Sequence, residues 1–205
     1  LTRLADGRLV IIGGRATDPV TGNPSDLTNI DIFNPATNTL ASGGALQQGR
    51  SQHTATLLPD GRIFVAGGLR RDAGTDTALQ SAEIYDPATG SCQLLSTLMN
   101  VARFGHSAVL LADGGHVLLA GGLWAGRTAE VYDISGNSFT STGPTVAWRS
   151  GPTATLLTAG PNAGKVLIAG GLGGDSRAVS LAELFDPAGG GTFNTHAAMR
   201  VARGN

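Results

Sequence analysis

The fold of this chain is decided by residues 103–132, RFGHSAVLLADGGHVLLAGGLWAGRTAEVY. The stretch holds two apolar runs, 106–111 and 116–120, which are joined by an Asp-Gly turn and closed by a pair of glycines. Short runs that are rich in Val and Leu and bounded by glycine are typical of buried strands, and Asp-Gly between two such runs is typical of a hairpin. A helix would need a longer run without the glycines. The stretch therefore predicts a β-hairpin, a loop and a third strand that contains Tyr132.

The same landmarks occur four times along the chain in one order. The first is a pair of glycines, at Gly13 and Gly14, Gly67 and Gly68, Gly121 and Gly122, and Gly170 and Gly171. The second is an acidic residue two positions before an aromatic one, at Asp31 and Phe33, Glu83 and Tyr85, Glu130 and Tyr132, and Glu183 and Phe185. The third is an arginine that opens the following unit, at Arg50, Arg103, Arg149 and Arg203. This recurrence predicts tandem units over about 1–49, 50–102, 103–148 and 149–202, with a further unit starting at 203–205.

The repeated pattern resembles the kelch repeat, most cleanly at residues 50–68, RSQHTATLLPDGRIFVAGG, and 81–87, SAEIYDP. The resemblance covers essentially all of the 205 residues. The chain is similar to bacterial kelch proteins and to the central domain of galactose-oxidase-like enzymes. This resemblance implies an all-β, kelch-type β-propeller with about four four-stranded antiparallel blades, which form part of a larger six- or seven-bladed ring. A ring closed at four blades is the alternative. Departures from the pattern are Pro152 in place of the His of the second and third units, Asn34 and Ile134.

Strand order places the loops on two ends of such blades. In an up-and-down blade the Asp-Gly and Asp-Pro turns share one end, and the loops after Gly-Gly share the other with the connectors between blades. The loops after Gly-Gly differ from unit to unit, and rigid scaffolds present recognition residues in such loops. Candidate ligand-binding residues are the charged and aromatic side chains of these loops: Arg15, Arg70, Arg71, Trp124, Arg127, Asp175 and Arg177. Solvated loops without a ligand are the alternative.

Residues that recur in every unit are expected to be structural. A site that a ring needs once has no reason to recur, whereas an ion pair that stabilises each blade does, so we expect the repeated Arg and Glu side chains to pair. Tyr85 and Tyr132 occupy the repeated aromatic position of the third strand and are expected in the core. Two histidines, His53 and His106, suggest a metal site, but a third ligand is not identifiable in the sequence, and structural histidines are the favoured interpretation.

The sequence offers no catalytic constellation. Galactose-oxidase-like enzymes use tyrosines and histidines as copper ligands, but both tyrosines here lie in the structural position and the single cysteine, Cys92, lies in an expected outer strand. We therefore expect no metal, no cofactor and no catalysis by this segment, and a protein- or glycan-binding scaffold is the favoured function. The alternative is a fragment of a secreted galactose-oxidase-like or sialic-acid-mutarotase-like enzyme whose catalytic residues lie outside it.

Charge and hydropathy restrict the partners. The net charge of −1 and the arginines spread over all units argue against nucleic acid. The sequence has no apolar run long enough for a membrane-spanning helix. The compartment stays open, with a secreted or cell-surface bacterial location compatible with an export signal upstream of Leu1. Uncovered apolar blade faces at the ends of the array predict self-association.

Overall fold

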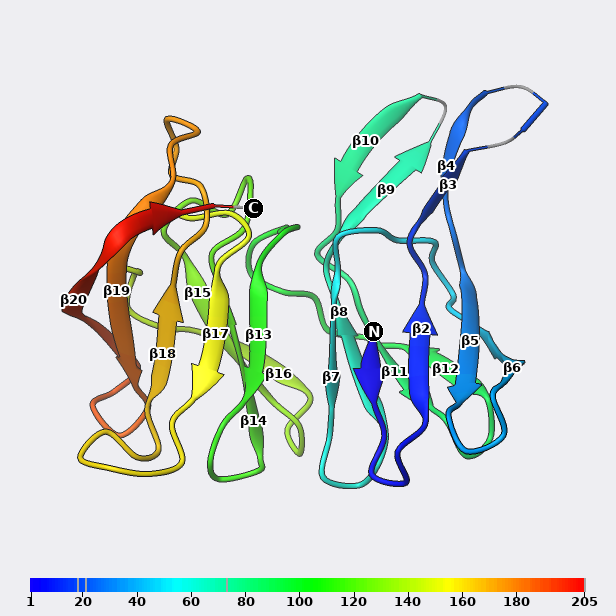
Figure 1. Ribbon diagram of the computed structural model, residues 1–205, viewed down its shortest axis with the longest axis horizontal. Coiled ribbons are helices and arrows are strands. Elements are labelled where there is room, and N and C mark those ends of the chain that lie inside the picture. The colour runs from blue at the N-terminus through cyan, green and yellow to red at the C-terminus, as the bar shows by residue number, and fades with distance from the viewer. Residues whose placement is uncertain (18, 21, 73, 205) are drawn as a thin grey trace. The chain divides into compact units, whose positions relative to one another are not determined.

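The chain consists of β-strands joined by turns and loops (Figure 1). The computed structural model describes residues 1–17, 19–20, 22–72 and 74–204, and no helix occurs among them. The chain divides into two compact units, Leu1–Leu98 and Met99–Asn205. Each unit contains two four-stranded antiparallel sheets, so the prediction of four four-stranded blades is confirmed.

The first unit contains two blades and two additional hairpins. Its first blade consists of β1 (Thr2–Arg3), β2 (Leu9–Ile12), β5 (Asn29–Asn34) and β6 (Thr39–Ala45). Its second blade consists of β7 (Thr54–Leu57), β8 (Ile63–Ala66), β11 (Ala82–Asp86) and β12 (Ser91–Leu94). The additional hairpins are β3 (Arg15–Thr17) with β4 (Pro24–Asp26) and β9 (Leu69–Asp72) with β10 (Thr75–Ala78).

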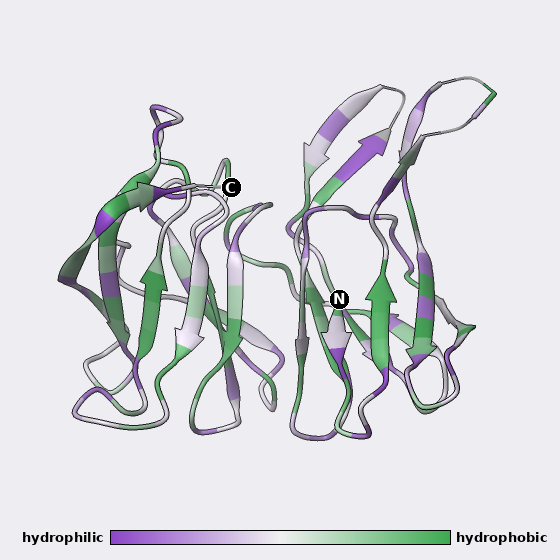
Figure 2. Cartoon of the chain, in the orientation of Figure 1, coloured by the Kyte–Doolittle hydropathy of each residue, from purple (hydrophilic) through white to green (hydrophobic). Residues whose placement is uncertain are grey.

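These two hairpins are a structural finding that the sequence did not predict, since residues 15–29 and 69–80 read as loops. Their strands are short and polar, and Figure 2 shows hydrophilic colour along β9, so hydrophobic alternation gives no strand signal there. In these hairpins the cross-strand partners carry opposite charges, Arg15 with Asp26 and Arg71 with Asp76, and these charge pairs stabilise the strand pairing in place of apolar contacts.

The second unit repeats the four-stranded plan. Its first blade consists of β13 (Ser107–Leu110), β14 (His116–Ala120), β15 (Ala129–Asp133) and β16 (Ser138–Ser141). Its second blade consists of β17 (Thr153–Leu156), β18 (Val166–Ala169), β19 (Val179–Asp186) and β20 (Thr192–Arg203). The structure places Arg203, the expected start of a further unit, at the end of β20, where it pairs with Val179, and Asn205 lies outside the described residues.

Each unit is held together by the apolar faces of its two blades. In the first unit, Val10 and Ile30 of one blade pack with Val65 and Tyr85 of the other. In the second unit, Leu118 packs in the same way with Ile168 and Phe185. Figure 2 shows the second strands β2 and β18 in the hydrophobic colour. In β2, Val10 and Ile12 are buried against the second blade of the unit, whereas Ile11 on the opposite face is 41% exposed.

Within each unit the two ends of the blades differ. The turns β1–β2, β5–β6, β7–β8 and β11–β12 lie at one end of the first unit, and the β3–β4 and β9–β10 hairpins extend from the other (Figure 1). The glycine pairs begin the loops of this second end. At Gly122 φ is 102°, and a Cβ atom there would lie 2.8 Å from the carbonyl oxygen of Phe104, so only glycine fits.

Candidate functional site

The repeated arginines and glutamates form buried ion pairs. The Nη2–Oε1 distances are 2.6 Å for Arg50 and Glu83, 2.7 Å for Arg103 and Glu130, and 2.6 Å for Arg149 and Glu183. In each pair both side chains are almost fully excluded from solvent. The Nη1 atom of each arginine donates to the carbonyl of the first glycine in its pair, Gly67, Gly121 or Gly170.

The same glutamates also hold the connectors between blades. The carboxylate of Glu83 accepts the backbone N–H groups of Gln47 and Gln48 at 2.7 and 3.1 Å, and that of Glu130 accepts the N–H of Asn100 at 2.8 Å. A connector therefore donates its backbone groups and its arginine to one buried carboxylate. This arrangement fixes the direction in which each connector enters the next blade, which is a structural role.

The two tyrosines are buried and the cysteine is partly buried, within single blades or between the blades of one unit. The Tyr85 hydroxyl donates to the carbonyl of Gly43 at 2.7 Å, and Tyr132 packs on Phe139 with ring centroids 4.9 Å apart. Burial and the neighbouring Glu83 carboxylate, 3.1 Å from Sγ, raise the pKa of the Cys92 thiol to about 12. Among the described residues, the His, Cys, Asp and Glu side chains form no group of three suited to a metal ion.

In the first unit, the candidate residues Arg15 and Arg71 connect the β3–β4 hairpin with the β9–β10 hairpin. Arg15 pairs with Asp26 of its own hairpin at 2.9 Å and with Asp76 of the β9–β10 hairpin at 2.8 Å, while Arg71 lies 3.2 Å from Asp76. The Asp26 side chain is only 1% exposed, and this burial raises its pKa. The hydrogen bonds from Arg15 and from the N–H of Arg71 lower the pKa by a larger amount, so the pKa of Asp26 lies below its ordinary value. Arg15 and Arg71 thus join the two hairpins, and the neighbouring Arg70 pairs with Thr77 in β9–β10.

In the second unit, Trp124 and Arg127 lie in one loop between β14 and β15. Trp124 is 64% exposed and has a φ of 66°, and its ring meets that of Phe104 edge-on with centroids 5.9 Å apart. Arg127 Nε donates to the carbonyl of Thr145 at 2.6 Å, and the Thr145 N–H donates to the carbonyl of Arg127 at 2.8 Å. The loop is therefore anchored to a connector at one point and presents an indole at another.

The two remaining candidates lie in the loop between β18 and β19. Arg177 is 87% exposed at its side chain and lies 3.7 Å from Asp175, which makes this pair a solvated one. Gly174 of the same loop lies directly against the ring of Trp148, where a side chain at position 174 would not fit. Trp148 is partly exposed and belongs to the connector, so the second unit presents two tryptophans from its loops and connectors.

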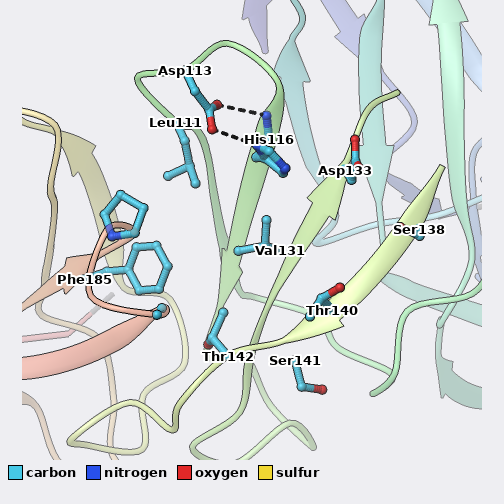
Figure 3. Close-up of a pocket in the computed structure, with 13 residues that line it drawn as sticks. Leu111, Asp113, His116, Val131, Asp133, Ser138, Thr140, Ser141, Thr142 and Phe185 are labelled. Carbon is cyan, nitrogen blue, oxygen red and sulfur yellow. Dashed lines mark hydrogen bonds and ion pairs between the residues drawn. The ribbon is translucent and has the colours of Figure 1, made fainter. Parts of the chain in front are cut away.

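A cleft of about 360 Å³ lies at the turn end of the second unit, and the sequence analysis missed it (Figure 3). It opens between the two blades of this unit, and its lining combines acidic, imidazole, hydroxyl and apolar groups. The residues that define its chemistry are Leu111, Asp113, His116, Val131, Asp133, Ser138, Thr140, Thr142, Phe185 and Pro187. His116 Nδ1 lies 2.7 Å from Asp113 Oδ2.

A repeated position accounts for His116. The residue that precedes or begins the second strand is basic in all four blades: Arg8, Arg62 and His116 bind an aspartate of the preceding turn (Asp6, Asp60, Asp113), and Lys165 binds Asp186 at the end of β19. His116 is the only imidazole among these four basic residues.

Comparison with known proteins shows a motif match, two sequence relatives and a similar fold. The family model of the Kelch motif matches residues 50–99. Two curated sequences of galactose oxidase from Gibberella zeae are 29% identical to this chain over 120 residues, which are 57% of this chain and 18% of the relative. The chain thus aligns with less than a fifth of the length of these relatives. The solved structure of YjhT superimposes with a TM-score of 0.80 at 15% identity and covers 99% of this chain and 71% of its own.

The matches agree with the four blades and the repeated landmarks. Among the described residues, no helix has the length and apolar character needed to cross a membrane. The kelch motif match, the four-stranded blades and the structural likeness confirm the resemblance stated from the sequence. Residues 50–99 carry the Kelch motif, and the fold of the chain is that of a kelch-type β-propeller segment with four-stranded blades.

Proposed function

We propose that this protein is a binding scaffold that captures a protein or a glycan through the loop end of its blades, without catalysis of its own. The observation that carries the proposal is the exposed but fixed position of Trp124. Exposed tryptophans and arginines are enriched among the residues that dominate binding energy, and an ordered aromatic ring loses little entropy when a partner covers it. We also propose that the four blades form part of a larger six- or seven-bladed ring.

The fixed position of Trp124 results from three local features. The left-handed backbone at Trp124 turns the side chain outward, and the edge-on contact with Phe104 supports one side of the indole. The bond from Arg127 Nε to the Thr145 carbonyl then closes the loop against the connector. The exposed indole face suits the apolar face of a sugar ring or an apolar side chain of a protein.

The candidate arginines of the first unit play a different part in this proposal. Arg15 is engaged by Asp26 and Asp76, and Arg71 by Asp76, so both stiffen the two hairpins. Their proposed function is to fix the two hairpins relative to each other. Contacts with the captured partner in this unit are made by hairpin residues that face solvent.

A second candidate is a fragment of an enzyme whose catalytic residues lie outside these 205 residues. The alignment with galactose oxidase favours it. Oxidation of galactose and other sugars by the full-length protein, measured as hydrogen peroxide release with added copper, tests this alternative directly.

The binding proposal is tested with Trp124→Ala and the matched control Trp148→Ala. Glycan-array binding and capture of co-secreted or cell-surface proteins are measured for both variants and for the unaltered protein, together with thermal melts. We expect Trp124→Ala to weaken capture at least tenfold with little change in melting temperature, and Trp148→Ala to weaken it less. Equal capture by Trp124→Ala and the unaltered protein would exclude the loop as the binding surface.

A further inference from the structure

The cleft at the turn end of the second unit is a feature of the fold with an unusual lining. The first unit has a cleft of about 400 Å³ at the corresponding place between its own two blades, lined by residues that include Ile32, Ser42, Gly43, Tyr85 and Pro87. The repeat relates Ile32 to Val131 and Tyr85 to Phe185, so both clefts arise where the blades of a unit separate toward their turns. What differs between the clefts is the chemistry of their walls.

Of these two clefts, only that of the second unit has acidic and imidazole groups among its described lining residues. Asp133 stands where the first blade of the chain has Asn34, and His116 stands where that blade has Arg8. Thr140 and Thr142 replace Ala41 and Gly43. In the first unit, the described lining residues carry no carboxylate. Asp133 is the repeated turn aspartate that also occurs as Asp86 and Asp186, so its presence alone is structural. What distinguishes the cleft of the second unit is that its described lining places this carboxylate beside an imidazole and two threonine hydroxyls.

The register of the strands explains why these groups meet. His116 on β14 pairs with Asp133 on β15, and Asp133 pairs with Ser138 on β16, so all three share one face of the blade. Val131 and Thr140 pair on the same face, nearer the core. This face is apolar where it packs on the second blade of the unit and becomes polar at the turn end. Figure 3 shows Phe185 and Leu111 on one side of this opening and Thr140 and Asp133 on the other.

The hydrogen bonds leave one carboxylate oxygen available. Both oxygens of Asp113 are engaged, Oδ1 by the N–H groups of Gly115 and His116 and Oδ2 by His116 Nδ1. Asp133 uses Oδ1 for Ser135 and Gly136, which leaves Oδ2 to accept from a ligand. The bonds from Gly136 and Ser135 lower the pKa of Asp133, so its carboxylate is ionised at neutral pH.

The bond to Asp113 also orients the imidazole. When His116 is neutral, Nδ1–H donates to Asp113 and Nε2 is an acceptor. The hydroxyl oxygens of Ser138 and Thr140 add two further acceptors on the same face. Neither arginine nor lysine occurs among the described lining residues, and the single lysine of the chain, Lys165, lies in an adjoining groove 2.9 Å from Asp186.

We propose that this cleft binds a small organic cation, an ammonium group attached to an apolar body. The ammonium group donates to Asp133 Oδ2, with Thr140 and His116 Nε2 as further acceptors. The apolar body lies against Leu111, Val131 and Phe185, and an aromatic face also favours a cation nearby. The volume of about 360 Å³ suits a ligand of this size. The proposal concerns the turn end of the blades and is independent of capture at the loop end.

The test uses three aromatic probes of similar size: benzylamine, benzyl alcohol and benzoate. They differ in charge but share the aromatic ring, so their comparison isolates recognition of the cation. Amide chemical shifts of the full chain locate the binding, with Gly136, Gly190 and Gly191 reporting on the cleft and Gly90 on the corresponding cleft of the first unit. We expect benzylamine to bind with a Kd of about 1 mM, as for a ligand of this size, and the other probes at least tenfold more weakly.

The deciding variant is Asp133→Asn, with Asp86→Asn as its matched control. Asparagine is the residue of the first blade at this repeat position (Asn34), and Asp86 occupies the same position in the second blade, outside the described lining of both clefts. We expect Asp133→Asn to weaken benzylamine at least tenfold and Asp86→Asn to change it less than twofold, with dispersed amide spectra for both. The proposal is overturned if benzylamine shifts no cleft amide, if benzyl alcohol or benzoate binds as tightly, or if the two variants bind benzylamine equally.

Discussion

The Arg103 guanidinium lies 2.7 Å from the Glu130 carboxylate, and the two side chains are almost completely buried. Burial lowers the pKa of Arg103, whereas Glu130 raises it again in part. A guanidinium group stays protonated in proteins. If its carboxylate partner is removed, a buried positive charge is left unpaired, which costs several kcal/mol of folding free energy. The pair therefore matters most when one partner is lost.

Glu130→Gln is expected to lower the free energy of unfolding by about 3–5 kcal/mol, because it leaves a buried arginine without its countercharge. Asp175→Asn is the control, since it breaks an exposed pair at 3.7 Å and is expected to change stability by less than about 0.5 kcal/mol. Urea denaturation of both variants measures the difference. Equal stability of the two variants would contradict a structural role for the repeated pairs.

A second prediction concerns His53 and acid. Burial, together with the positive charge of Arg50, lowers the pKa of His53 to about 4 from its ordinary value of 6.5. Between pH 6.5 and 4 the unfolded chain therefore binds a proton at this residue that the folded chain does not bind. Stability is lost as the pH falls through this window, by up to about 3 kcal/mol at its lower end.

His53→Gln isolates this effect from the titration of other groups. We expect the stability of the unaltered protein to fall more steeply from pH 7 to pH 4.5 than that of the variant, as measured by urea midpoints at each pH. The absolute stability of the variant at pH 7 does not enter the comparison. Parallel pH profiles would show that His53 keeps an ordinary pKa in the folded protein.

Sequence reasoning recovered the blades because their signals repeat. The glycine pairs occur in all four blades and the buried carboxylates of Glu83, Glu130 and Glu183 in three of them, so one physical need produces the same residue at a fixed period. The hairpins β3–β4 and β9–β10 were missed because their strands are polar and are linked by side-chain ion pairs, which hydrophobic periodicity does not detect.

The cleft of the second unit was missed for a different reason. His116 and Phe185 are far apart in the sequence, and both line the cleft because they lie on neighbouring blades that separate toward their turns. A basic residue occurs at the position of His116 in every unit, and the sequence alone does not show that this imidazole faces a cavity. Among the loop candidates, the sequence likewise did not show that Arg15 binds Asp26 and Asp76.

The third prediction compares two glycines of the same loop. Gly122→Ala places a Cβ atom 2.8 Å from the Phe104 carbonyl and 3.0 Å from the His106 Cβ, at a φ of 102°. Because backbone strain and a steric clash act together, we expect a loss of about 3 kcal/mol or more. Gly126→Ala also has a positive φ, 62°, but its Cβ meets nothing within 4 Å, so we expect a loss of about 1 kcal/mol.

Thermal and urea denaturation of the two alanine variants separate the clash from the strain. Since both positions flank Trp124, their binding behaviour is informative as well. Gly126→Ala keeps the contact between the connector and the glycine pair, and we expect it to disturb the loop locally and to weaken capture at the loop end. Gly122→Ala displaces the connector at Phe104, the ring that supports Trp124, and so lowers stability and capture together. Equal stability of the two variants would mean that the glycine pair is not required for the connector to approach.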